Sequence, residues 1–178
     1  MCVCLDAAGQ VEGVNTKLIE LAGKTVGPCQ ACGACTKELR CAMDDDFGEF
    51  IEVFQDPTFA GLIVGTPVYF GLMTAQCKAF LDRTVVFRRN GWMLRDKVGG
   101  VLALGRFRNG GQELTIQAVR AAMLCHDMIC VSDGQPTAHF GAALCSGGEG
   151  GLAADKQGLE TARNLGQRVA EVVKRFTV

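Results

Sequence analysis

The feature that most constrains the fold is a set of short apolar runs separated by helix-like stretches. The runs AGLIVGT (60–66) and VGGVLALG (98–105) carry no charged residue, and HDMICVSD (126–133) and NTKLIELAG (15–23) are weaker runs of the same kind. Strands that are buried on both faces, as in parallel sheets, have this composition. The sequence therefore predicts four strands of a parallel sheet.

Amphipathic stretches occupy the intervals. Apolar residues recur with a helical period in 73–86, 110–125 and 155–176, and a shorter helix in 47–57 is expected to end at Pro57. The expected buried stripe of the last helix comprises Leu159, Ala162, Leu165, Val169, Val172, Val173 and Phe176. Strands that alternate with helices indicate an α/β fold, a doubly wound parallel sheet covered on both faces.

Length and composition favour one domain over residues 1–178, because 48% of the residues are hydrophobic and no linker or repeat interrupts the pattern. Ligands of such sheets bind at the carboxyl ends of the strands. This rule places the crevice at TPVYFG (66–71), GRFRNGG (105–111) and the stretch 134–151. The glycine-rich segment 145–155 is expected to be a mobile loop.

Charge and hydropathy exclude several classes of partner. The formal net charge is −1 and no run of Lys and Arg occurs, which gives no basis for binding nucleic acid or an anionic membrane. No apolar run reaches the roughly 18 residues of a membrane span. The opening MCVCLDAAGQ lacks the basic region of a signal peptide, so we expect a cytoplasmic protein whose thiols stay reduced.

The densest chemical signal is CQACGACTKELRC (29–41), with the spacing Cys29-x2-Cys32-x2-Cys35-x5-Cys41. Three cysteines at two-residue intervals allow one tight loop to wrap an iron-sulfur cluster, and a fourth completes the ligand set. Structural zinc sites usually pair two C-x2-C knuckles across a longer spacer, so zinc is the second interpretation. A site without metal is the third, and the polar residues between the cysteines make a plain core segment the least favoured.

The remaining cysteines and the two histidines carry weaker signals. Five cysteines lie in apolar or helical contexts and are expected to pack as small hydrophobic residues: Cys2, Cys4, Cys77, Cys125 and Cys130. Cys145 lies in the segment that faces the crevice. His126, at a strand start, is interpreted as a packed or capping residue, whereas His139 is a candidate for contact with a flavin or substrate.

The segment GTPVYFGLMTAQCKAFLDR (65–83) resembles the flavin-binding loop of the NADPH-dependent FMN reductase-like flavoproteins, which have a flavodoxin-like fold. Together with the cysteine run, with GRFRNGGQE and with the closing DKQGLETARNLGQRVAEVV, it is similar to the iron-sulfur flavoprotein branch of that family. The resemblance covers the chain from about Val14 to its end. It implies bound FMN and a 4Fe-4S cluster.

The resemblance also implies a set of site residues. The implied cluster ligands are Cys29, Cys32, Cys35 and Cys41, within an inserted cysteine loop at about 27–48. The implied flavin-binding residues are Thr66, Pro67, Val68, Tyr69, Phe70 and Gly71 on one side, and Gly105 and Arg106, followed by Asn109 and Gly110, on the other. Asp44 and Asp45 match acidic positions of the family that follow the cysteine motif.

One expected unit has no counterpart in the sequence. Flavodoxin-like proteins hold the FMN phosphate in a loop between the first strand and the first helix, and no such strand and loop are visible before the strand expected at 15–23. CVCLDAAGQVEG (2–13) instead matches the end of the first helix. We expect the chain to be a fragment whose start was placed too late in its reading frame, with a partner chain or a rearranged sheet as alternatives.

The leading functional interpretation is an FMN- and iron-sulfur-dependent electron-transfer flavoprotein that links two-electron and one-electron carriers, with no catalytic acid or base. The expected partners are a ferredoxin-like redox protein or NAD(P)H, and the resemblance implies a homo-oligomer, a dimer or tetramer with the cysteine loop at an interface. Two alternatives stay open. One is an NAD(P)H-dependent FMN or quinone reductase with a zinc or empty cysteine site, and the other is a non-catalytic, metal-stabilised binding domain that has lost FMN.

Overall fold

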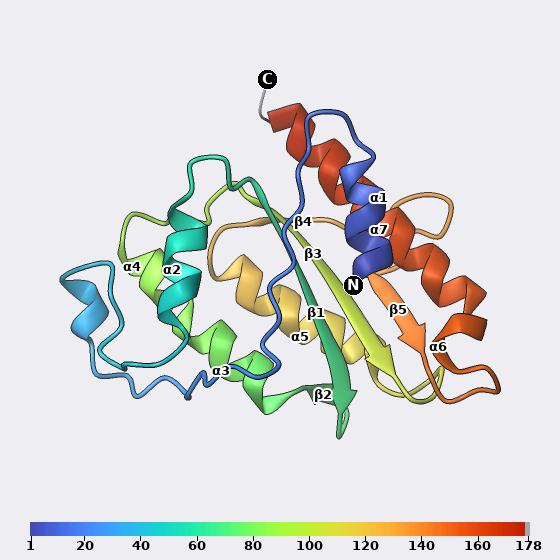
Figure 1. Cartoon of the computed structure of the whole chain (residues 1–178), viewed down its shortest axis with the longest axis horizontal. Helices are drawn as coiled ribbons and strands as arrows, with labels where there is room; N and C mark the ends of the chain where they lie inside the picture. Colours follow the sequence, from blue (N-terminus) through green and yellow to red (C-terminus); the bar gives the residue numbers. More distant parts are fainter. Residues whose placement is uncertain (177–178) are drawn as a thin grey trace.

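The computed structural model describes residues 1–176, and its centre is a twisted sheet (Figure 1). Strand β1 (Gly61–Tyr69) pairs in parallel with β3 (Val98–Gly105), from Gly61 opposite Val98 to Pro67 opposite Leu104. The short β4 (Ile129–Cys130) and β5 (Ala142–Cys145) pair in parallel with the other edge of β3. Strand β2 (Leu72–Met73) turns back antiparallel to the end of β1.

Helices cover both faces of this sheet (Figure 1). The helical elements, in chain order, are α1 (Cys2–Gly9), the 3-10 turn η1 (Ala34–Thr36), α2 (Gly48–Gln55), α3 (Ala75–Arg83), α4 (Val85–Arg89), α5 (Gln112–Leu124), α6 (Gly151–Ala154) and α7 (Lys156–Phe176). None of them, within residues 1–176, is both long and apolar enough to cross a bilayer. The arrangement is the doubly wound α/β fold that the alternating pattern predicts.

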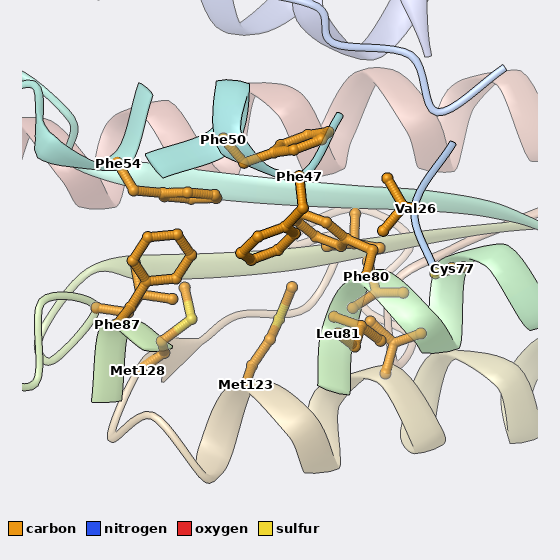
Figure 2. Packing of buried hydrophobic residues seen from close by; sticks show 14 of the residues in the cluster. Val26, Phe47, Phe50, Phe54, Cys77, Phe80, Leu81, Phe87, Met123 and Met128 are labelled. Atoms are coloured by element: carbon orange, nitrogen blue, oxygen red, sulfur yellow. The ribbon is translucent and has the colours of Figure 1, made fainter. Parts of the chain in front are cut away.

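The two faces of the sheet are filled differently. One face is packed with aromatic rings from α2, α3 and α4, with Phe50 and Phe80 at a centroid distance of 4.7 Å, and with Met123 and Met128 beneath them (Figure 2). The other face is aliphatic and lies under α7, whose neighbour α1 packs so closely that a Cβ at Gly166 would lie 1.9 Å from the Cys4 carbonyl oxygen. The aromatic face carries the cysteine loop on its outer side (Figure 1).

Most predicted elements are present, with shifted ends. The run 98–105 is β3 without change, and β1 extends three residues beyond the predicted 60–66. The predicted helix 73–86 is two helices, because the chain bends at Thr84, whose hydroxyl donates to the Leu81 carbonyl oxygen at 2.6 Å. In α7 the predicted stripe is buried or half-buried except for Phe176, which is 63% exposed.

Two strand predictions are wrong in whole or in part. Residues 15–23 form no strand but a coil, from which Ile19 and Leu21 pack onto the aromatic cluster, so hydrophobic contact occurs without a ladder of hydrogen bonds. In 126–133 only Ile129–Cys130 is a strand, because the chain leaves the edge of β3 after Val131 and returns as β5. The sequence did not predict β5, which is only four residues long.

Candidate functional site

The first wall of the crevice is the hairpin at the end of β1. Tyr69 pairs with Leu72, and Phe70 and Gly71 form a two-residue turn with φ values of +50° and +89°. The positive φ angles of both residues match a type I′ hairpin turn, which favours Asn or Gly at its first position rather than Phe. Phe70 therefore sits in a left-handed conformation that is unfavourable for a bulky residue, and its side chain is fully exposed.

Thr66 anchors this wall from below. The side chain is buried, its hydroxyl accepts from the Thr74 backbone N–H at 3.3 Å, and Thr74 in turn caps α3 by accepting from the Cys77 N–H at 3.1 Å. The hairpin is thus fixed to the start of α3. Of the predicted flavin residues, Pro67 and Val68 lie within β1, while Tyr69, 66% exposed, is available at its end.

The second wall is the loop from Gly105 to Gly111, and the buried side chain of Gln112 holds it. The Gln112 amide donates to the carbonyl oxygens of Phe107 at 2.6 Å and Leu144 at 3.0 Å, and its oxygen accepts from the Gly110 N–H at 2.9 Å. Gly105 leaves space for this side chain, since a Cβ there would lie 2.4 Å from Gln112 Nε2. The predicted residue Arg106 is exposed above this anchor.

The two walls meet at a pair of glycines. Gly111 has a φ of +96°, and a Cβ on it would lie 3.1 Å from the Gly71 carbonyl oxygen. Glycine is required there for both the backbone conformation and the close approach. Five large apolar side chains of these walls and of early α5 are at least half exposed: Tyr69, Phe70, Leu72, Phe107 and Leu114.

The segment 145–155 is less free than its glycine content predicts. It begins with the last residue of β5, contains α6, and is tied to α7 by Asp155. That carboxylate accepts from the Cys145 N–H at 2.7 Å and the Gly158 N–H at 3.0 Å and forms an ion pair with Arg108. Burial alone would raise the pKa of Asp155, but these hydrogen bonds and the guanidinium hold it below its ordinary value.

A hollow of about 330 Å³ lies beside the second wall rather than between the two walls. It is lined by Arg108, Asn109, Gly111, Gln112 and other residues of α5, β5 and α7, and by His139. His139, whose side chain is 48% exposed, lies 3.6 Å from the buried carboxylate of Asp133. The crevice candidate His139 therefore faces this hollow, which has none of the residues 66–71 in its lining. His126 is buried and shares a 2.7 Å hydrogen bond with Thr84, as predicted for a packed residue.

The four cysteines of the run line a second and smaller hollow of about 20 Å³. Cys29 and Cys32 are exposed, whereas Cys35 and Cys41 are partly buried. Left-handed backbone at Ala31 and Gly33, with φ values of +53° and +78°, curls the chain on either side of Cys32, and η1 follows directly. The four cysteines thus share one hollow, and their role as cluster ligands stays a prediction.

A pair of carboxylates closes the base of this loop. Asp45 accepts from the Gly27 N–H at 3.0 Å and the Phe47 N–H at 3.2 Å, and Asp46 accepts from the Thr25 N–H at 2.6 Å. Asp45 also forms an ion pair with Arg83 of α3, in which the side chains are 9% and 1% exposed. Burial alone would raise the pKa of Asp45, but the hydrogen bonds from Arg83, Gly27 and Phe47 hold it below its ordinary value.

Helix α4 holds the outer part of the loop. The Asn90 side chain donates to the Cys35 carbonyl oxygen at 3.0 Å, and Arg89 Nη1 donates to Cys35 Sγ at 3.2 Å. Both arginines, Arg83 and Arg89, belong to the lining of the small hollow. The cysteines are thus backed by two guanidinium groups on adjacent helices.

The sulfur atoms surround the hollow without converging on a point. Within residues 1–176, no three Cys, His, Asp or Glu side chains stand close enough together to hold one metal ion as they are. The residues present nevertheless fit a thiolate-bound iron-sulfur cluster, because the lining supplies four soft sulfur donors, two cations and no carboxylate. Cys29, Cys32, Cys35 and Cys41 are the side chains that would hold it.

Several residues that shape these sites were not predicted from the sequence. Asp45 was noted only as an acidic position, and Gln112, Arg83 and Arg89 were not singled out at all. A charged residue at an otherwise apolar helix position, as Arg83 is in α3, is the one signal that pointed to a buried partner. The two carbonyl oxygens and the one backbone N–H group that bind the Gln112 side chain have no sequence signature.

The packing prediction for the other cysteines is correct for three of them, since Cys4 and Cys77 are buried and the half-buried Cys130 packs against the aromatic cluster. Burial raises the pKa of the Cys4 thiol to about 11, so this thiol is unreactive. Cys2 and Cys125 are exposed, and the prediction that they pack in the interior is wrong, because Cys2 lies on the solvent side of α1 and Cys125 follows the end of α5. Cys130 and Cys145 are half-buried.

The fold and the two sites together define a class of protein. A parallel sheet covered by helices on both faces, with its candidate crevice at the carboxyl ends of β1 and β3, is a flavodoxin-like α/β protein. A structural comparison agrees, since a WrbA-like flavodoxin from Agrobacterium tumefaciens superposes with a TM-score of 0.55 and 29% sequence identity, over 65% of this chain and 66% of that one.

The chain belongs to the NADPH-dependent FMN reductase family, whose model matches residues 2–143. It is 47% identical to an iron-sulfur flavoprotein of Methanocaldococcus jannaschii over 163 residues, which are 92% of this chain and 83% of the relative. An iron-sulfur flavoprotein of Methanosarcina thermophila is 38% identical over 162 residues, 91% of this chain and 80% of the relative. The predicted family and its iron-sulfur flavoprotein branch are therefore confirmed.

Proposed function

We propose that this protein is an FMN-dependent oxidoreductase that carries a 4Fe-4S cluster on Cys29, Cys32, Cys35 and Cys41 and connects two-electron with one-electron carriers. FMN supplies both one- and two-electron chemistry when bound, and a cluster exchanges one electron at a time. The observation that carries the proposal is that all four cysteines line one hollow backed by two arginines. The names of the two similar iron-sulfur flavoproteins support the same assignment.

The crevice residues have binding and orienting roles in this proposal. Tyr69 and Phe70, both exposed, would bind the isoalloxazine ring, and the backbone from Thr66 to Gly71 would offer hydrogen bonds to its polar edge. Gly105 and Arg106 would bind it from the second wall. The strained left-handed conformation of Phe70 supports this role, because such strain concentrates where a structure presents a side chain for binding.

The electron donor in the proposal is NAD(P)H or a ferredoxin-like protein, and the protein acts in the cytoplasm as a homo-oligomer. The exposed apolar side chains around the contact of Gly71 with Gly111 support a second copy on this edge. Sedimentation analysis of the wild type and of Phe70→Asp tests the oligomer. A monomeric wild type contradicts it, and dissociation only in the variant supports it.

The decisive experiment counts cofactors. The protein is purified without oxygen, and iron, acid-labile sulfide, zinc and FMN are measured per chain. About four irons and four sulfides support the cluster, whereas zinc without sulfide identifies the reductase with a zinc site. A colourless protein that releases no flavin on denaturation identifies the non-catalytic alternative.

The flavin position needs its own test. Tyr69→Ala removes the side chain that is exposed at the end of β1, and we expect a weaker FMN affinity and a changed visible flavin spectrum. Trp92→Ala is a control, since Trp92 is also an exposed aromatic but stacks with Arg88 on α4. A Tyr69→Ala protein with the affinity and spectrum of the wild type would show that the ring lies elsewhere.

A further inference from the structure

Arg83 has more hydrogen-bonding capacity than its protein partners use. Its side chain is 1% exposed, and Nη1 donates to Asp45 and to the Gly27 carbonyl oxygen at 3.4 Å. Nε and Nη2 are buried and make no hydrogen bond with any of residues 1–176. Leaving a buried donor unsatisfied is costly, and more so for a charged group, so a buried guanidinium with two unpaired nitrogens indicates an acceptor that is absent from the polypeptide.

The position of Arg83 shows where that acceptor would lie. Arg83 is part of the lining of the hollow formed by the four cysteines, and so is Arg89, which donates to Cys35 Sγ at 3.2 Å. The lining contains no carboxylate, and Asp45 compensates only one of the two cations from outside it. The lining of the hollow therefore holds two guanidinium groups, one of which donates to a sulfur atom.

We propose that Arg83 and Arg89 are positioning residues for the cluster, which donate hydrogen bonds to its sulfur atoms and hold its reduction potential above the value that four cysteines alone would give. The inference rests on the proposed function. A cluster bound by four thiolates is anionic, and its reduction adds one electron and no atoms. Neighbouring cations and hydrogen bonds to sulfur stabilise the more negative, reduced form, which raises the potential.

A purely structural role for both arginines is a less complete account. The ion pair with Asp45 accounts for the position of Arg83 Nη1 and for the closed base of the loop. It does not explain why Nε and Nη2 are buried without partners among residues 1–176. An arginine side chain stays protonated in proteins, so the guanidinium of Arg83 keeps its charge in the interior. A structural role does not explain why a permanent cation lies beside the thiols.

The experiment measures the cluster's potential by electron paramagnetic resonance during a redox titration of the whole protein. In Arg89→Gln we expect the equilibrium constant for reduction to fall about tenfold, which corresponds to about 59 mV for one electron. Arg88→Gln is the matched control, because Arg88 is the adjacent residue of α4 but stacks on Trp92, 4.5 Å from the ring centroid, and does not line the hollow. Arg89→Lys restores the charge and is expected to recover most of the loss.

Arg83→Lys tests the buried residue while keeping a cation for Asp45. We expect a fall in potential at least as large as that in Arg89→Gln, at unchanged iron and sulfide content. Loss of iron in either variant, with a full cluster in Arg88→Gln, also supports the positioning role. Unchanged potentials in both variants, with full clusters, would overturn the inference and leave the proposed function standing. Wild-type protein without iron and sulfide would overturn the proposed function and this inference with it.

Discussion

The cysteine loop, residues 27–46, and the crevice loops, residues 66–74 and 105–112, are held by different forces. The cysteine loop is closed at its base by carboxylates, backbone N–H groups and the buried Arg83. The crevice loops are held by the neutral side chains of Thr66 and Gln112 and by the contact of Gly71 with Gly111. The cysteine loop depends mainly on ionised groups, whereas the crevice loops depend mainly on shape and neutral hydrogen bonds, with one ion pair between Arg108 and Asp155.

The difference is related to the group that each region is proposed to bind, a cluster on the cysteine loop and FMN at the crevice loops. The ionised groups at the foot of the cysteine loop make its stability sensitive to substitution and to protonation, since an ion pair between buried groups is costly to break and changes with protonation. The crevice loops are attached to the central strands and have no ionised anchor among the contacts that fix Thr66 and Gln112. Substitutions and pH should therefore affect the two regions in different ways.

The largest effect is expected from Asp45→Ala. The substitution leaves the buried Arg83 without its counter-ion and frees the Gly27 and Phe47 N–H groups, and breaking a buried pair in this way costs about 3–5 kcal/mol. We expect the free energy of unfolding to fall by that amount, together with faster proteolysis within the cysteine loop. Denaturant unfolding and limited proteolysis measure these two quantities.

Asp44→Ala is the matched control for this prediction. Asp44 is the preceding residue and is exposed to solvent. Surface substitutions of this kind usually change stability by less than about 0.5 kcal/mol. Equal losses in the two variants would mean that the loop's base responds to total charge and not to the Asp45 and Arg83 pair.

The sequence predicted the local features of the two regions but not their long-range contacts. The cysteine spacing and the apolar runs are local patterns, and they predicted the shared hollow and the strands β1 and β3 because those features depend on neighbouring residues. The base of the cysteine loop depends on Asp45 meeting Arg83 across 38 positions, and no local pattern reports such a pair. A run of apolar residues also cannot reveal whether a strand has a neighbour, and so 15–23 was wrongly predicted as a strand.

Gln112→Ala is expected to have the second largest effect. It removes three hydrogen bonds of a buried amide and leaves the carbonyl oxygens of Phe107 and Leu144 and the Gly110 N–H without a partner. We expect a loss of about 2–3 kcal/mol in the free energy of unfolding. We also expect weaker FMN binding, because residues 105–111 lose their anchor, and calorimetry with FMN measures this.

Glu113→Ala is the neighbouring control, because Glu113 is exposed on the same turn of α5. It is expected to change neither stability nor flavin affinity by a measurable amount. The cysteine loop should keep its resistance to proteolysis in Gln112→Ala. Loss of that resistance would show that the two regions are coupled and do not respond separately.

Acid should loosen the base of the cysteine loop more than the contacts of Gln112, and it also weakens the pair of Arg108 with Asp155 in the second crevice loop. The pKa of Asp45 is lowered in the folded protein, so its contribution to stability is complete above the unfolded pKa and is lost as the pH falls through the folded pKa. The effect should be smaller than that of Asp45→Ala, because a protonated carboxyl group keeps its place and part of its hydrogen bonding. Amide hydrogen exchange, corrected for the intrinsic rate at each pH, measures it.

The two regions supply reporter groups for this measurement. The Gly27 and Phe47 amides donate to Asp45 and should lose protection in acid, whereas the Gly110 amide donates to the neutral Gln112 and should keep it. In Asp45→Asn the pH dependence at Gly27 and Phe47 should disappear. A parallel loss of protection at Gly110 would mean that acid acts on the second crevice loop as well, through the pair of Arg108 with Asp155 or through the fold as a whole.

The smallest effect is expected at Thr74, in the first crevice loop. Its hydroxyl accepts from the Cys77 N–H at 3.1 Å and caps α3, and removal of such a cap costs about 1 kcal/mol. Thr74→Ala should therefore reduce the free energy of unfolding by about that amount, and Thr74→Ser, which keeps the hydroxyl, should recover it. The Thr74 backbone N–H still donates to Thr66 in both variants, so the hairpin keeps its second attachment. A loss as large as that of Asp45→Ala would contradict the comparison, because a single neutral hydrogen bond would then matter as much to one region as a buried ion pair does to the other.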